Sequence, residues 1–97
     1  MHTTVGLILA EATEARQRMH KMHQAILLSY LQQKPHAVRA RLAMDYHRAQ
    51  EVSQTWDRLA YTGDEAAFLA QARTLCHELR SGEVFERLRE ILEGDDE

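Results

Sequence analysis

The segment SYLQQKPHAV (residues 29–38) separates two long helical patterns and contains Pro35, the single proline of this 97-residue chain. Proline suits the first position of a helix but breaks a helix interior, because it has no backbone N–H to donate. We therefore expect one helix to end shortly before Pro35 and a second helix to begin there. A turn as short as 33–36 sets two such helices antiparallel.

Apolar residues recur at alternating spacings of three and four on both sides of this turn, as they do in helices that pack in pairs and in coiled coils. The first stripe comprises Val5, Ile8, Ala12, Ala15, Met19, Met22 and Ile26, and the second comprises Val38, Leu42, Asp45, Ala49, Val52, Trp56 and Leu59. A tight turn brings residue i of the first helix close to residue 69 − i of the second. Trp56 then lies opposite the small side chains of Ala12 and Ala15, which favours close packing. The stripes predict a long antiparallel helical hairpin, with helices over about 4–33 and 35–61.

The remaining chain predicts two shorter helices, over about 63–80 and 83–93, followed by an acidic tail at 94–97. Thr62-Gly-Asp-Glu65 has the spacing of a capping box, in which Thr62 caps the third helix and Glu65 bonds back to the Thr62 amide. Gly82 can adopt the left-handed conformation that closes a helix, although a single kinked helix is also compatible with the sequence. Thr3 or Thr4 can cap the first helix. We expect residues 1–97 to form a single all-α domain.

The composition supports this fold class. The chain is 44% hydrophobic and 28% charged, as in folded soluble proteins, and residues that favour helix dominate it. Its single cysteine, Cys76, excludes an internal disulfide and favours a reducing compartment, so we expect a cytoplasmic protein. No apolar run approaches the roughly 18 residues of a membrane span, and we expect no membrane contact.

The length of the hairpin predicts an oligomer. A first helix of about 30 residues is about 45 Å long, whereas the two C-terminal helices are much shorter and can cover only one flank of the hairpin. Leucines near the turn would remain in water, and such patches usually mark interfaces. We expect a homodimer or another helical protein to complete the bundle, and a closed monomer is the alternative. The expected contact residues are apolar side chains of the first helix: Leu7, Leu9, Leu27, Leu28, Tyr30 and Leu31.

The net charge of −3 conceals an asymmetry between the two halves of the chain. Residues 1–50 carry seven Lys and Arg against three acids, whereas residues 51–97 carry five Arg against twelve acids. Basic residues near the closed end of the hairpin could steer an acidic partner or contact phosphate. Nucleic acid is the less favoured partner, because the chain is acidic overall and carries no nucleic-acid-binding motif. The basic tip residues are Lys34, Arg39, Arg41 and Arg48.

Polar residues in and near the stripes suggest two further hypotheses. Asp45 interrupts the second stripe, and a buried carboxylate needs a partner. We expect His23 of the facing helix to pair with it and set the register of the hairpin, with Arg41 and Arg48 as alternative partners. His20 and His23 are close enough on one helix to share a metal ion, but the sequence offers no clear third ligand, and we expect no metal or other cofactor.

No catalytic motif is present. Cys76 lies on the apolar face of its helix without a histidine placed to activate it, and nothing resembles a phosphate loop or a nucleophile elbow. We expect a protein that is not an enzyme but a small helical interaction module: an adaptor, a chaperone-like protein or a regulatory subunit. The alternatives are a nucleic-acid-associated accessory protein and a metal- or ligand-responsive bundle.

Overall fold

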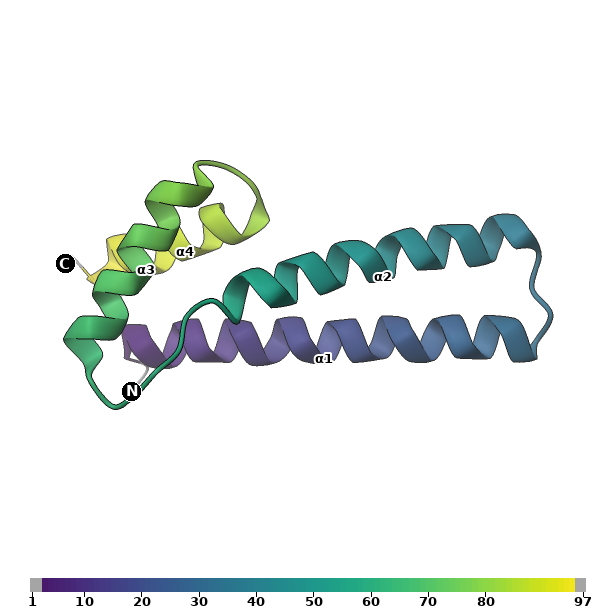
Figure 1. The fold of residues 1–97 in the computed structure, drawn as a ribbon, viewed down its shortest axis with the longest axis horizontal. Coiled ribbons are helices and arrows are strands. Elements are labelled where there is room, and N and C mark those ends of the chain that lie inside the picture. Colours follow the sequence, from purple (N-terminus) through teal and green to yellow (C-terminus); the bar gives the residue numbers. More distant parts are fainter. Residues whose placement is uncertain (1–2, 96–97) are drawn as a thin grey trace.

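The computed structural model describes residues 3–95, which form four helices and no strand (Figure 1). The helices are α1 (Thr4–Leu31), α2 (His36–Trp56), α3 (Glu65–Leu79) and α4 (Glu83–Asp95). The predicted all-α fold is confirmed, and the two C-terminal helices are separate. The helix expected to end at 93 continues to Asp95, so the predicted acidic tail begins inside α4, and its residues 96–97 lie outside the described part of the chain.

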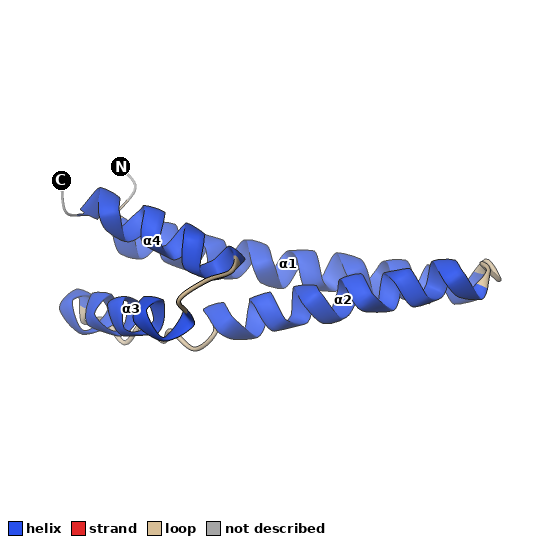
Figure 2. Ribbon diagram, turned by 90° about the horizontal axis from the view of Figure 1, so that it is seen from above, coloured by secondary structure: helices blue, strands red, loops and turns tan. Residues whose placement is uncertain are grey.

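The long arms α1 and α2 lie side by side and antiparallel (Figures 1 and 2). Their register is the predicted one, as two contacts show. The rings of His23 and Tyr46 have centroids 5.7 Å apart, and the Arg39 guanidinium lies 4.9 Å from the centroid of the Tyr30 ring. The residue numbers of each pair add up to 69, as a turn at 33–36 requires.

The helix ends follow local backbone chemistry, which corrects part of the prediction. The Gly6 amide donates to Thr3 Oγ1 at 2.9 Å, so Thr3 caps α1. The predicted capping box at Thr62 is wrong: Asp64 caps α3, and its carboxylate accepts from the Ala67 amide at 3.1 Å. Gly63 has a φ of 98°, which is incompatible with a helix, so α3 can begin only after it.

The second arm is also shorter than expected. It ends at Trp56, with Asp57 as its C-cap, and residues 57–64 form a connection instead of continuing the helix. This connection allows Leu59 to pack against the core. At the other end of α3, Arg80 adopts the left-handed conformation with a φ of 63°, and Gly82 follows with a φ of 101°.

The core lies at the open end of the hairpin, where α3 and α4 cover the N-terminal half of α1 (Figure 2). Trp56 and Ala15 are both buried there, and Ala12 packs against the same cluster, as the register predicted. The buried apolar side chains are Val5, Ile8, Ala15, Trp56, Phe68, Ala72, Leu75, Val84, Leu88, Ile91 and Leu92.

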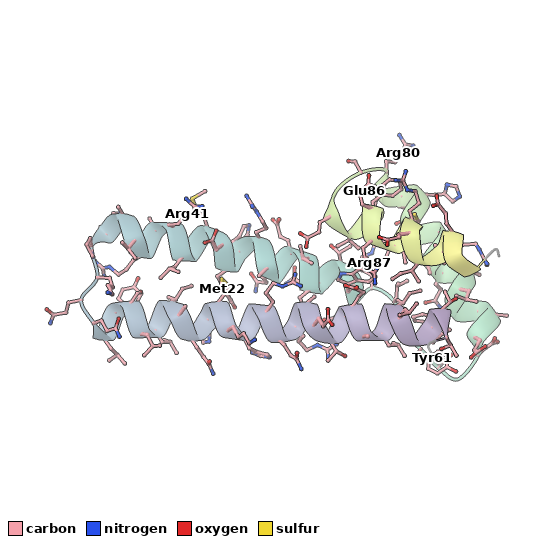
Figure 3. All side chains as sticks on the ribbon, turned by 180° about the vertical axis from the view of Figure 1, so that it is seen from behind. Met22, Arg41, Tyr61, Arg80, Glu86 and Arg87 are labelled. Carbon is pink, nitrogen blue, oxygen red and sulfur yellow. The ribbon has the colours of Figure 1, made fainter. Side chains whose placement is uncertain are left out.

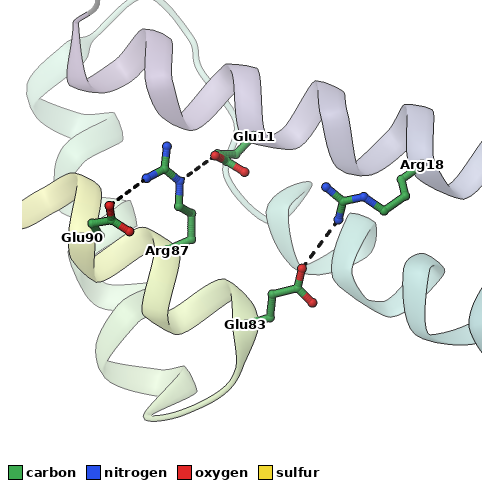
Figure 4. Close-up of polar contacts among 5 residues, drawn as sticks. All are labelled: Glu11, Arg18, Glu83, Arg87 and Glu90. Carbon is green, nitrogen blue, oxygen red and sulfur yellow. Dashed lines mark hydrogen bonds and ion pairs between the residues drawn. The ribbon is translucent and has the colours of Figure 1, made fainter.

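Two ion pairs join α4 to α1 beside this core (Figure 4). Arg87 Nε donates to Glu11 Oε1 at 2.6 Å, and Arg18 Nη1 lies 3.6 Å from Glu83 Oε1. The hydrogen bond to Glu11 is the main reason why the pKa of Arg87 lies above its ordinary value. The C-terminal helix is therefore held on α1 by charge as well as by its apolar face.

The molecule is elongated, with extents of 51 × 25 × 20 Å and a radius of gyration of 16.2 Å. A compact chain of this length has a radius of gyration of about 12.5 Å. We name residues 17–50 the distal arm and the other described residues the head. In the distal arm, Ser29 is the one buried residue. No helix within residues 3–95 combines the length and apolar character that a membrane crossing requires.

Candidate interaction surface

Four exposed leucines lie on one face of α1. Leu9, Leu27, Leu28 and Leu31 are exposed by 37, 52, 53 and 79%, respectively. At 100° per residue they fall on one side of α1, about 90–190° around the helix from the centre of the stripe that packs on α2. We name this side the outer face of α1. Its members, all exposed, are Leu9, Thr13, Gln17, His20, Gln24, Leu27, Leu28 and Leu31.

Most of the predicted contact residues are thus exposed and free to contact a partner, and Leu7 is the exception. Leu7 is half-buried and packs against the core, because its position on the helix turns it toward the head. Tyr30 is exposed, and its ring lies beneath the Arg39 guanidinium on one flank of the hairpin. The exposed apolar set also includes residues that the sequence did not indicate: Val38, Met44 and Tyr61.

Tyr61 was missed because the sequence pattern placed it inside the second helix. It lies in the connection between α2 and α3, with its ring 5.6 Å from Phe68 in an edge-on contact. Figure 3 shows it at the N-terminal end of α1, on the side of α1 away from α4. The outer face of α1 therefore has an apolar group at each end, Tyr61 with Leu9 at the head and the three leucines at the tip.

The predicted basic tip does not form a single patch. Arg39 stacks on Tyr30 on one flank of the hairpin, and its Nε is buried without a hydrogen-bond partner. Arg41 lies on the other flank, where its Nε is 3.6 Å from Asp45 Oδ1. Arg48 and Asp45 border a shallow cleft of about 210 Å³ on that flank, next to the start of α4. Lys34 is exposed in the turn.

The predicted pair of His23 and Asp45 is not formed. The register places His23 against Tyr46, whereas Asp45 is one residue away and therefore turned about 100° around α2. Its carboxylate instead pairs with Arg41, one of the two arginines considered as alternatives. The predicted pair therefore does not fix the register of the hairpin.

His20 and His23, the candidate metal ligands, lie about 60° apart around α1. His20 lies on the outer face of α1 and His23 turns toward Tyr46. In the described part of the chain, no group of three or more His, Cys, Asp or Glu residues is arranged to hold a metal ion. Cys76 is half-buried, and burial is the main cause that raises the pKa of its thiol above the ordinary value, which disfavours the reactive thiolate.

The exposed surface formed by the outer face of α1 and the distal arm is suited to packing against another helix. It combines a stripe of apolar and amide side chains on α1 with a basic distal arm, and its side chains are exposed along the whole of α1. Such a surface can bury apolar area and pair charges. Neither a protein-family model nor a curated protein nor a solved structure matches this chain.

Proposed function

We propose that this chain is a small helical protein–protein interaction module that works as an adaptor or regulatory subunit. The head is the folded anchor, and the distal arm with the outer face of α1 is the surface that a helical partner covers. One observation carries the proposal. In a stretch of about 34 residues only Ser29 is buried, while Leu27, Leu28 and Leu31 are exposed by half or more.

The total surface supports this reading quantitatively. The accessible surface is 6893 Å² for a chain of 11.2 kDa. A compact monomer of that mass exposes about 5,700 Å². The difference, about 1,200 Å², is larger than the roughly 800 Å² that one partner contributes to a stable interface of standard size. Covering the distal arm is thus enough to give the chain an ordinary surface area.

The charge of the arm suggests how a partner is attracted. Residues 17–50 carry six Lys and Arg against one acid, Asp45. Charged residues around an apolar stripe mainly raise the association rate and select partners of opposite charge. The expected partner surface is therefore a helix or helical pair with an apolar stripe and acidic flanks.

Site-specific photo-cross-linking tests this function. A photoreactive residue replaces Leu28 in one variant and Gln71, an exposed residue of α3 in the head, in the matched control. Each variant is irradiated both as purified protein and in an extract of the source cells. We expect discrete protein adducts from position 28 in at least one of the two settings and only background from position 71. Equal adduct patterns at the two positions would contradict the proposal.

A further inference from the structure

We propose that the outer face of α1 binds the same face of a second copy of this chain, with the two α1 helices antiparallel. This inference rests on the proposed function and names its partner. Residue i of one copy then faces about residue 36 − i of the other. Leu9 meets Leu27 of the second copy, and the tip with Leu31 reaches Tyr61 in the head of the second copy.

The residue pattern of the outer face suits a pairing with itself. Its apolar residues lie at the two ends, Leu9 at one and Leu27, Leu28 and Leu31 at the other, and all are exposed. Between them lie Gln17, His20 and Gln24, whose side chains can hydrogen-bond with one another. Packing two such faces places the distal arm of each copy, which alone has only two helices, against the head of the other copy.

Charge selects the antiparallel orientation, since apolar contact alone permits both orientations. The distal arm, residues 17–50, has a net charge of +5, so the other residues of the chain account for −8 of the total of −3. A parallel pair would place arm against arm and head against head, with like charges together. An antiparallel pair places the basic arm of each copy against the acidic head of the other.

Individual side chains fit this orientation. Glu14 and Lys21 lie on the same flank of α1, two turns apart, so a register near 36 − i brings Glu14 of each copy beside Lys21 of the other. Lys34 in the turn extends beyond α1 toward Glu65 of the second copy, at the start of α3 in the head. All four side chains are exposed, and none forms an ion pair with a side chain of residues 3–94.

The symmetry of the pairing also limits its size. Each copy contributes the same face, so the interface is isologous and closes at two chains. The surface excess of about 1,200 Å² per chain exceeds what a standard dimer interface needs from each partner. The expected assembly is a stable dimer, not an open filament.

Two charge-reversed variants test the inference. The tip variant carries Lys21→Glu and Lys34→Glu, and the head variant carries Glu14→Lys and Glu65→Lys. Sedimentation equilibrium gives the dimer dissociation constant of the unchanged protein, of each variant and of their equimolar mixture, and circular dichroism verifies that each variant is folded. The changed side chains are exposed and unpaired, so the fold should persist.

The antiparallel dimer predicts that each variant alone dissociates about tenfold more readily or worse, because the facing positions 14 and 21, and 34 and 65, then carry charges of the same sign. The mixture should regain the dissociation constant of the unchanged protein, since both arm-to-head contacts become attractive again. Self-association of each variant at the original strength indicates a parallel pair and overturns the inference. Leu27→Ser should weaken every dimer in the series.

A monomeric protein at high concentration also overturns the inference. This outcome is distinguishable from failure of the proposed function. If position 28 still cross-links to a different protein in the extract, the interaction module stands and only its partner changes. If position 28 yields no specific adduct, both proposals fail.

Discussion

The head and the distal arm are built from the same helical stripe and differ in how much of it they bury. Along α1, Val5, Ile8 and Ala15 are buried in the head, whereas Met19 and Met22 are only half-buried in the arm, although the spacing is unchanged. The difference is the number of neighbouring helices. In the head, α3 and α4 close over the stripe, while in the arm α1 packs along α2 and the start of α4 reaches α1 at Arg18. The apolar stripe of α1 thus determines which side chains contact α2. These side chains become fully buried only where a third helix also packs on them.

The largest expected effect compares one leucine from each region. Leu88 is fully buried in the head, and Leu31 is 79% exposed at the tip. Leu88→Ala should lower the free energy of unfolding by about 3 kcal/mol, because it removes buried methyl groups and leaves a cavity. Leu31→Ala should change it by less than about 0.5 kcal/mol. Urea unfolding at low protein concentration, where association does not contribute, measures both, and equal losses would refute the division into two regions.

A smaller effect is expected from the ion pair that joins the head to α1. Arg87→Met removes the 2.6 Å bond to Glu11 and should cost about 1 kcal/mol, since both side chains are partly exposed and solvent screens the pair. Arg89→Met is the matched control, because Arg89 pairs with Glu86 and Glu93 of its own helix and should cost only a few tenths of a kcal/mol. Thermal unfolding in low and high salt measures the loss of stability in each of the two variants. An Arg87 variant as stable as the control would show that apolar packing alone holds α4 on α1.

Each region also contains one turn in which a residue other than glycine has a positive φ. These residues are Arg80 in the head, with a φ of 63°, and Gln33 at the tip, with a φ of 53°. Arg80→Gly and Gln33→Gly should each raise the free energy of unfolding by about 0.5–1 kcal/mol, because glycine adopts this conformation without strain. Ser81→Gly, at a position without a positive φ, should be neutral or destabilising. Chemical denaturation measures all three, and a loss at both turn positions would show that those side chains make compensating contacts.

The smallest expected effect concerns thiol reactivity. Burial raises the pKa of Cys76 in the head, so its thiolate fraction at pH 8 is lower than that of a free thiol. A thiol placed on the exposed distal arm by Ala43→Cys, in a Cys76→Ser background, should alkylate severalfold faster. The rate of Cys76 should continue to rise to higher pH than that of the reference thiol. Rates of iodoacetamide labelling across pH 7–10 test this, and coincident profiles would contradict it.

Local patterns in the sequence were sufficient for the helices and for the register of the hairpin. The spacing of the apolar residues and the position of the single proline determine how the two adjacent helices pair. The contacts of His23 with Tyr46 and of Arg39 with Tyr30 confirm that pairing. The exposure of Leu27, Leu28 and Leu31 was predictable too, because the lengths of the helices limit what can cover them. Single polar contacts were less predictable. A shift of one residue turns a side chain by about 100°, so Asp45 faces Arg41 and not His23.

The amino-acid sequence by itself thus determined an all-α chain, one antiparallel hairpin and an excess of apolar surface, all of which depend on interactions between near neighbours or on simple length. Only the tertiary structure decided where α3 and α4 dock, that Leu7 belongs to the head and that Tyr61 lies at the end of the outer face. Those outcomes depend on the path of the connection at 57–64 and on packing between residues far apart in the chain. The spacing of apolar residues indicates which face of a helix is apolar. It does not indicate which other apolar helix face packs against that face.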